Sequence, residues 1–422
     1  MSDPNCWYVG VDWGSESHCV FLTDAQGRKV GEKTFRHSGD GLAEMAAWVL
    51  KTCAVEDSGQ VLVAIEVPHG PVVETLIERG FAVHAINPKQ MDRFRDRFSM
   101  SGAKDDSRDA RVMASCLRTD PQSFRKLQAA DPLLVELREW SRIAEELGVE
   151  RNRLANRLRD QLWRYFPALL ELDPDGGDEW LLDFLELAPT PAKAARLRQA
   201  KIADLLKRRR IRRFDAAMLI KTVSARPPQV AAGTVEAASA HVASILPRLR
   251  LINRQIKDAE RRLGELTDAL VAAERGEPET EPGQIKQHDA VILASLPGVG
   301  RTILATLLAE AWEPLQRRDY AALRSLAGVA PVTKKSGKTR IVSRRQACNE
   351  RLANALYHWA RVAMQHDPRS RAKYAELRKR GCTHGRALRT IADRNLNVAC
   401  AMLRVGATFD PSIVGKNAQK TT

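Results

Sequence analysis

The 422-residue sequence lacks any uninterrupted apolar run of about 18 residues, the length that a membrane span needs, and it lacks an apolar export segment near its start. We therefore expect neither a membrane span nor an export signal. Its seven cysteines are scattered, with no C-x-x-C pair and no histidine at zinc-finger spacing. This pattern predicts reduced thiols in a cytoplasmic protein and argues against a structural zinc site.

Negative charge is also scarce relative to positive charge. Lys and Arg number 67 against 52 Asp and Glu, which gives a formal net charge of +15. Such an excess favours a polyanionic partner, with nucleic acid ahead of an anionic membrane surface. Composition therefore predicts a soluble nucleic-acid-binding protein with no membrane partner.

Three stretches of different character follow one another along the chain. Residues 1–120 alternate short apolar runs with amphipathic patterns, which predicts an α/β domain with a mixed sheet and helices on its faces. Residues 121–288 carry two long helical patterns and predict a helical or coiled-coil spacer that ends in a polar linker. Residues 289–410 form a predicted mainly helical domain, and 411–422 a flexible tail. The expected fold class is α/β plus all-α.

Carboxylates stand at the ends of two predicted strands and at the start of a predicted helix. Asp12 ends the first strand and Glu66 the fourth, and ligands collect at the carboxyl ends of adjacent parallel strands. Asp109 shares a helix face with Asp106, three residues away, or with Asp105, four away. If these acids meet, hard divalent cations such as Mg²⁺ or Mn²⁺ would relieve their repulsion. Two such ions about 4 Å apart can activate a nucleophile and stabilise the leaving oxygen when a phosphodiester bond is cleaved.

The same acidic stretch also has an ordinary explanation. Asp105 or Asp106 can cap a helix, and Asp109 can pair with Arg108 or Arg111 on the surface. From these residues alone, a solvated helix start is the more frequent outcome. A third alternative, the first phosphate loop of an actin-like or sugar-kinase ATPase, also follows a first strand, but the other motifs of that fold are missing from the sequence.

A basic stretch near the C-terminal end, "VTKKSGKTRIVSRRQACNE", holds a second candidate group. Ser336 precedes Gly337, which gives the backbone freedom that an attacking hydroxyl needs, and cations would neutralise the charge that develops on a phosphate. The candidate phosphate-binding cations are Lys334, Lys335, Lys338, Arg340, Arg344 and Arg345. From the chemistry alone, a loop that only grips phosphates is the more frequent case, and Ser343 is a rival nucleophile.

The segment "LPGVG" at 296–300 is a third candidate. It resembles a helix-hairpin-helix turn, in which the N–H groups of glycines such as Gly298 and Gly300 contact backbone phosphate without reading sequence. An ordinary turn between two helices explains it equally well.

Taken together, these motifs resemble one group of insertion-sequence transposases. The pattern is strand-Asp12, strand-Glu66, Lys-x-Asp106-x-x-Asp109-Ala, the stretch "INPKQMDRFR" and the C-terminal "AGVAP" before Ser336-Gly337. The group includes relatives of the Piv and MooV DNA invertases and the bridge-RNA-guided recombinases. It implies an N-terminal domain like the RuvC resolvase, of RNase H fold. A threonine is common in the group at position 105, so we choose Asp106 as the ligand.

The resemblance implies a specific activity for a bacterial, nucleoid-associated enzyme. Ser336 would attack DNA and form a covalent phosphoserine, while Asp12, Glu66, Asp106 and Asp109 would hold Mg²⁺. The implied partners are donor and target DNA, a structured guide RNA and further copies of the chain in a dimer of dimers. The alternatives are a metal-dependent Holliday-junction resolvase or nuclease that uses water, and a non-catalytic scaffold that binds nucleic acid.

Overall fold

The structure, a computed structural model, describes residues 6–98, 105–128, 131–273, 288–337 and 339–410. The chain divides into two compact units, Met1–Asp131 and Pro132–Thr422, which we call the N-terminal and C-terminal units. The predicted linker and the predicted tail at 411–422 lie outside the described residues. Within those residues no helix combines the length and the apolarity that crossing a membrane would require.

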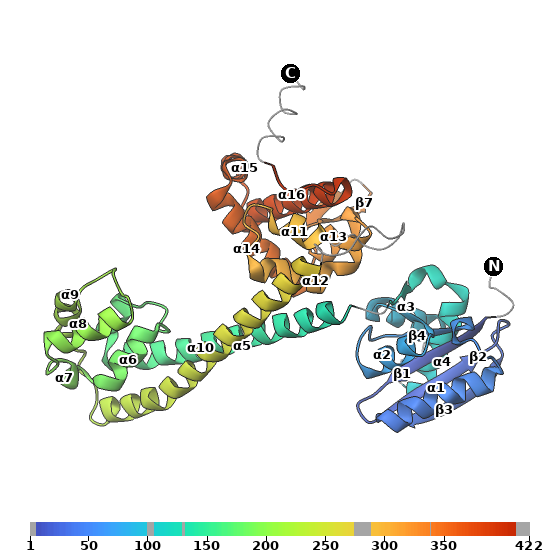
Figure 1. Cartoon of the computed structure of the whole chain (residues 1–422), viewed down its shortest axis with the longest axis horizontal. Coiled ribbons are helices and arrows are strands. Elements are labelled where there is room, and N and C mark those ends of the chain that lie inside the picture. The colour runs from blue at the N-terminus through green and yellow to red at the C-terminus, as the bar shows by residue number, and fades with distance from the viewer. Residues whose placement is uncertain (1–5, 99–104, 129–130, 274–287, 338, 411–422) are drawn as a thin grey trace, which may run out of the picture. The chain divides into compact units, whose positions relative to one another are not determined.

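A six-stranded mixed sheet forms the centre of the N-terminal unit (Figure 1). In spatial order its strands are β3 (Lys29–Arg36), β2 (Ser17–Thr23), β1 (Trp7–Trp13), β4 (Val61–Ile65), β5 (Ala82–Ala85) and β6 (Arg125–Lys126). β1 runs antiparallel to β2 and parallel to β4, and β4 runs parallel to β5. The sequence predicts a meander of three strands within residues 7–37, then a continuous apolar run at 60–68 and a second buried strand at 81–86. The structure confirms these five strands. The short edge strand β6 has no counterpart in the sequence prediction.

Helices cover both faces of this sheet. One face carries α1 (Gly39–Cys53) and α2 (Pro71–Glu78), and the other α3 (Pro88–Phe98) and α4 (Asp106–Thr119). Val9 and Val11 point towards α1 and α2, whereas Tyr8 and Ala64 lie beneath α3 and α4. This alternation follows from the two-residue period of a strand. Even-numbered positions of β1 and β4 therefore face α3 and α4.

Two long antiparallel helices form a stalk in the C-terminal unit. They are α5 (Pro132–Tyr165) and α10 (Thr234–Ala273). The apolar spacing in the sequence predicts one long helix from Leu133 to Phe166 and a second from about residue 235 to 275, so both are confirmed. Leu137 of α5 and Leu263 of α10 belong to one core, whereas Leu158 and Ile245 belong to another, so the two ends of the stalk enter different cores. At 1.5 Å per residue, the 34 residues of α5 extend about 50 Å.

One end of the stalk carries a small helical module with its own core, which we call the distal module (Figure 1). Its helices between the two stalk helices are α6 (Glu179–Leu187), α7 (Pro191–Ala194), α8 (Gln199–Arg208) and α9 (Ala216–Val223). Trp180 and Phe184 lie at the centre of that core, each less than 2% exposed. The described part of the chain also contains three short 3-10 helices, of which only the last belongs to this module: η1 (Ser58–Gln60), η2 (Pro121–Ser123) and η3 (Pro167–Glu171).

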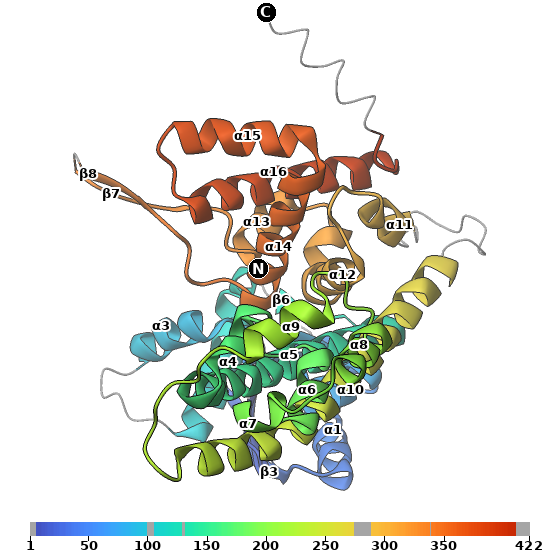
Figure 2. The same cartoon turned by 90° about the vertical axis from the view of Figure 1, so that its left-hand side faces the viewer.

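The other end of the stalk joins the C-terminal helices. These are α11 (His288–Ala294), α12 (Arg301–Gln316), α13 (Tyr320–Leu326), α14 (Glu350–His366), α15 (Pro368–Lys379) and α16 (His384–Val405). An antiparallel two-stranded ribbon, β7 (Val332–Ser336) and β8 (Thr339–Ser343), extends from these helices (Figure 2). The expected fold class, α/β plus mainly helical, is confirmed. The expectation of a basic loop around Ser336 is wrong, because β-branched residues of this segment pair as strands.

Candidate active site

Asp12 and Glu66 occupy matching positions on two adjacent parallel strands. β1 and β4 pair with Val11 opposite Ile65, and each acid comes one residue later. Asp12 is an even-numbered residue of β1 and so faces the side of the sheet that α3 and α4 cover. Glu66 directly follows β4, and its contact with Arg95 of α3 places it on the same side. Each is partly buried. The first and fourth strands are therefore neighbours, which is the condition under which the sequence would bring the two acids to one edge of the sheet.

Gly10 allows α4 to lie directly on β1. A Cβ at this position would stand 1.9 Å from the backbone oxygen of Ala110 and 2.8 Å from the backbone nitrogen of Ala114. Only a residue without a side chain admits the helix this closely. Because Asp12 follows Gly10 by two residues and Asp109 precedes Ala110, the contact brings the first turn of α4 towards the carboxyl end of β1.

Asp109 is held by Arg95, a residue that the motif analysis did not single out. Asp109 is 1% exposed. Its two carboxylate oxygens accept hydrogen bonds from Nε and Nη2 of Arg95 at 2.7 and 2.8 Å. The same Nη2 lies 3.6 Å from Glu66 Oε2, and Nη1 binds Asp92 at 2.7 Å. The hydrogen bonds to Asp109 raise the pKa of the Arg95 guanidinium. One guanidinium therefore links acids from β4 and α4.

A weak signal for Arg95 is present in the sequence. Met91 is buried and Phe94 is partly buried in the core under α3 and α4. Arg95 follows Met91 at a spacing of four, which puts it on the inward face of α3. A charged residue on an apolar helix face predicts a buried partner, and here that partner is Asp109.

Asp105 and Asp106 begin α4 in different ways. Asp105 is the N-cap, and its side chain accepts the backbone N–H of Ser107 at 3.4 Å. Asp106 is the first helical residue, and both acids are exposed. Because the carboxylate of Asp105 serves the helix, Asp106 stays our predicted ligand.

A concentration of negative charge surrounds Cys19 on β2. Burial, and after it the charges of Glu32, Asp12, Asp106 and Asp105, together raise the pKa of its thiol to about 11. These four carboxylates therefore lie within electrostatic range of one side chain. Glu32 belongs to β3 and accepts a hydrogen bond from the first turn of α4. It is a further acid of this edge that the sequence pattern did not indicate.

The chemistry of these side chains suits a divalent cation. Carboxylate oxygens are the ligands that Mg²⁺ and Mn²⁺ prefer. Throughout the described ranges, however, no three His, Cys, Asp or Glu side chains stand together in an arrangement ready to hold a metal ion. Arg95 occupies the place between Asp109 and Glu66 that a cation would take. The acids therefore fit a divalent cation on condition that Arg95 moves.

Ser336 lies in the C-terminal unit, at the end of β7 where the ribbon turns (Figure 2). It pairs with Thr339 across the turn, and its side chain is exposed. Gly337 follows with a φ of 55°, a left-handed conformation that favours glycine. The Ser-Gly pair is thus accounted for by the turn, and the nucleophilic role of Ser336 stays a prediction.

The cations expected to bind phosphate lie along the ribbon and just after it. Those exposed to solvent are Lys334, Lys335, Arg340 and Arg344. Arg345 is partly buried and donates to the backbone oxygen of Ala330 at 3.4 Å. Lys338 lies outside the described residues. The ribbon also exposes Ile341 and Val342, which are 57% and 55% accessible.

The two glycines of the "LPGVG" turn have different surroundings. Gly298 has a φ of 84°, and a Cβ there would stand 2.8 Å from the backbone nitrogen of Ala363 in α14. Trp359 of the same helix donates to the carbonyl of Pro297 at 2.9 Å. Gly298 therefore serves the packing of the turn on α14. Gly300 is exposed and has open space around it, so a phosphate contact remains predicted there.

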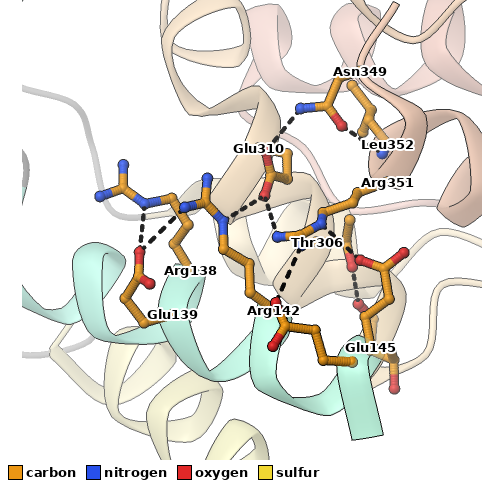
Figure 3. A network of polar contacts seen from close by, with 11 residues as sticks. Arg138, Glu139, Arg142, Glu145, Thr306, Glu310, Asn349, Arg351 and Leu352 are labelled. Carbon is orange, nitrogen blue, oxygen red and sulfur yellow. Dashed lines mark hydrogen bonds and ion pairs between the residues drawn. The ribbon is translucent and has the colours of Figure 1, made fainter. Parts of the chain in front are cut away.

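A polar network joins the stalk to the start of α14, the helix that follows the ribbon (Figure 3). The side chain of Glu310 in α12 is 8% exposed and accepts hydrogen bonds from Arg142 of α5 at 3.5 Å and from Asn349 at 2.7 Å. Asn349 also caps α14. Arg351 pairs with Glu145 of α5 at 2.7 Å. The base of the ribbon is thereby fixed to the stalk, while its turn remains exposed.

Two family models match the chain. The DEDD domain of IS110 elements, described as a transposase, matches residues 9–167. The "Transposase IS116/IS110/IS902 family" matches residues 290–375. The first match includes Asp12, Glu66, Asp106 and Asp109, and the second includes Ser336.

Three similar proteins extend this result. "Putative transposase y4uE" of Sinorhizobium fredii is 70% identical over 216 residues, which are 51% of this chain and 60% of that protein. "Mini-circle putative transposase for IS117" of Streptomyces coelicolor is 33% identical over 417 residues, 96% of this chain and 95% of that protein. "Insertion element IS110 uncharacterized 43.6 kDa protein", also of Streptomyces coelicolor, is 28% identical over 409 residues, with 96% and 95% covered.

Proposed function

The chain belongs to the IS116/IS110/IS902 family of transposases, and we propose that it excises and inserts an insertion sequence by cutting and rejoining DNA through Ser336. In this proposal Asp12, Glu66, Asp106 and Asp109 hold Mg²⁺. A guide RNA from the element selects donor and target DNA, and a dimer of dimers brings acids and serine together. The observation that carries the proposal is that the ends of β1 and β4 and the first turn of α4 each bring an acid to the same face of the sheet.

A serine nucleophile suits cutting followed by rejoining. The Oγ of Ser336 attacks phosphorus, and a new P–O bond forms as the bond to one sugar oxygen breaks. The serine loses its proton and the departing sugar oxygen gains one. The covalent link is again a phosphodiester, so a sugar hydroxyl can reverse the step without any other energy source. Lys334, Lys335 and Arg340 would neutralise charge that develops on the phosphate.

The acidic side chains would act on the same phosphate through the cation that they hold. A bound divalent cation supplies Lewis-acid stabilisation of the phosphate oxygens. Asp12 and Glu66 are fixed by paired strands, and Asp109 by its buried place on α4. Arg95 keeps Asp109 and Glu66 oriented before a cation binds. Positioning by rigid elements is what a reaction of this kind requires.

The serine assignment is tested with Ser336→Ala. We expect this variant to bind DNA as before and to form no covalent protein–DNA adduct on a denaturing gel. Ser343→Ala is the matched control, because Ser343 is exposed on the partner strand of the same ribbon, and it should still form the adduct. An adduct that persists in Ser336→Ala rejects the proposal.

A specific observation favours one second candidate, metal-dependent hydrolysis. The acids belong entirely to the N-terminal unit, whereas Ser336 is an exposed residue of the C-terminal unit. A resolvase or nuclease that activates water would need the acids alone. Ser336→Ala that still cleaves DNA, leaving ends without bound protein, would select this candidate over the first.

The guide-RNA part of the proposal has its own test. The net charge of +15 is compatible with holding RNA as well as DNA. Sequencing of the RNA that co-purifies with the protein should recover a transcript from the noncoding end of the same element. Random cellular RNA in its place would remove the guide from the proposal and leave the DNA chemistry unaffected.

A further inference from the structure

The distal module carries strongly one-sided charge around α7, α8 and α9. Between residues 188 and 235 there are 12 Lys and Arg but only two acids. Both acids have local roles: Asp204 pairs with Arg208 at 3.2 Å, and Asp215 caps α9 by accepting the N–H of Met218 at 2.8 Å. Little negative charge therefore remains on these elements to balance the cations.

The basic run at 207–213 contains paired and unpaired cations, and Arg208 belongs to the paired ones through Asp204. Arg209 forms two hydrogen bonds with Asp183, at 2.6 and 2.8 Å, and Arg213 binds Asp178 at 2.7 Å. These two arginines hold the run against α6 and the turn before it. The exposed group, whose side chains make no hydrogen bond or ion pair within the described part of the chain, consists of Lys207, Arg210 and Arg212.

Arg210 stands at a position where glycine is usual. After α8 the N–H of Arg210 binds the carbonyl of Lys207 at 3.1 Å, and the N–H of Ile211 binds that of Leu206 at 2.9 Å. This pair of bonds closes a helix with one left-handed residue, and Arg210 has a φ of 56°. A side chain in that conformation costs about 1 kcal/mol relative to glycine.

At Arg318 an ion pair compensates the same cost of a left-handed backbone conformation. It follows α12 with a φ of 54°, and its guanidinium binds the buried carboxylate of Asp289 at 2.5 and 2.7 Å. The side chain of Arg318 therefore stabilises the fold through this ion pair. Arg210 has no comparable partner among the residues that the structure describes. We therefore expect the Arg210 guanidinium to bind a partner outside this chain.

We propose that the distal module is a second DNA-binding site, where Lys207, Arg210 and Arg212 hold the phosphodiester backbone of duplex DNA. Arginine forks and lysine ammonium groups are the usual partners of backbone phosphates, and they bind without reading sequence. Phe214, the aromatic residue that ends the run, is 8% exposed and packs against Trp180. It therefore offers no ring for stacking single-stranded bases, which favours a duplex.

The place of the module gives this contact a distinct role. The distal core and the core beneath the ribbon lie at opposite ends of the stalk helices. A stalk of about 50 Å corresponds to about 15 base pairs of duplex at 3.4 Å per step. The module would thus hold DNA well away from the ribbon. The inference rests on the family's DNA substrate and is independent of the chemistry at Ser336.

The first test compares two triple variants of the full chain. Lys207→Gln, Arg210→Gly and Arg212→Gln remove the proposed contacts, whereas Arg254→Gln, Lys257→Gln and Lys379→Gln remove equal charge from exposed positions elsewhere. Binding of a labelled 40-base-pair DNA duplex is measured by anisotropy from about 50 to 200 mM salt. Three lost phosphate contacts lower the salt slope by about 2.7, so the wild type should lose about 40-fold more affinity over this range than the first variant.

The control variant should keep the wild-type slope. A slope that is equal in both triple variants overturns the inference. A decrease in salt slope that is seen only with an RNA duplex of the same length also overturns the inference, because RNA would then be the ligand. An altered oligomeric state with an unchanged slope would assign the cations to a partner protein and likewise overturn it. Adduct formation reports on Ser336 and the salt slope on the distal module, so the two proposals fail separately.

A second test separates binding from folding at one residue. Arg210→Gly removes the charge and also the backbone cost, so it should raise the melting temperature while weakening DNA binding. Arg210→Lys keeps both charge and cost, and should match the wild type in both measurements. A lower melting temperature for Arg210→Gly would mean that the arginine serves the fold, which contradicts the inference.

Discussion

The acidic edge of the N-terminal unit and the ribbon of the C-terminal unit are built in opposite ways. Asp109 is 1% exposed and lies between a packed helix and a sheet, with both oxygens bound by Arg95. Ser336 is exposed at the turn of two strands that pair only with each other. An isolated two-stranded ribbon is marginally stable in water. The acids are therefore positioned by the fold itself, whereas the ribbon gains its final position from what it contacts.

The strongest test of this difference removes one side chain from each region. Asp109→Ala leaves the Arg95 guanidinium without its main partner and should destabilise the N-terminal unit by about 3 kcal/mol. Ser336→Ala should change stability by less than about 0.5 kcal/mol. Hydrogen exchange of the amides in β1 and β4, and of those in α14, measures the two effects separately. Equal and small losses would show that Asp109 is not held as the contacts indicate.

The two glycines of these regions give a second contrast. Gly10→Ala places a methyl group 1.9 Å from a backbone oxygen of α4 and should cost about 3 kcal/mol, because the helix must move. Gly337→Ala meets nothing within 4 Å and should cost only about 1 kcal/mol, from its positive φ. Thermal unfolding followed by circular dichroism tests this order. A Gly10→Ala protein as stable as the wild type would exclude the close approach of α4 to β1.

The comparison also explains what the sequence could predict. A continuous apolar run marked β4, and strand-end acids marked Asp12 and Glu66, because burial and chain order are local signals. The pairing of β1 with β4 was a condition that the sequence left open and that the structure meets. Helix spacing likewise gave α5 and α10 almost to their ends, since a long apolar stripe repeats many times.

Other features depend on contacts that no local pattern carries. Helix spacing sets Arg95 apart from Arg93 and Arg97, but only the docking of α3 beside α4 identifies its partner as Asp109, 14 residues further along the chain. The ribbon was expected as a loop because both faces of β7 and β8 are exposed, which leaves no alternation of burial to detect. The role of Gly10 likewise requires the position of α4, which lies about 100 residues further along the chain.

Replacing Arg95 tests whether its guanidinium competes with a divalent cation for the acids of the N-terminal unit. In Arg95→Met the buried charge of Asp109 loses its partner, so the N-terminal unit should lose about 2 kcal/mol in chelator. Added Mn²⁺ should restore much of this loss, because a cation can then approach Asp109 and Glu66 without displacing a guanidinium. The shift in melting temperature per millimolar Mn²⁺ should therefore exceed that of the wild type. A smaller shift would make Arg95 a support of the metal ligands and not a competitor.

The smallest expected effect is a pH dependence confined to the N-terminal unit. His18 is fully buried on β2, with its Nε2 2.9 Å from His37 Nδ1, and burial lowers its pKa, followed by the charge of His37. Because the folded pKa lies below the unfolded value of about 6.5, the unfolded state binds more protons as pH falls through that value. Stability should therefore decline from pH 7.5 to 5.5, by up to about 1 kcal/mol.

His18→Gln should remove that part of the decline, as measured by hydrogen exchange of β2 at the two pH values, corrected for intrinsic rates. The ribbon carries no histidine between residues 332 and 343, so its corrected exchange should be unchanged across the same range. If β2 in the variant declined as steeply as in the wild type, the proton would have to bind elsewhere in the unit. If the ribbon declined with β2, the two regions would be coupled in stability, and the contrast between a fixed acidic edge and an adaptable ribbon would not hold.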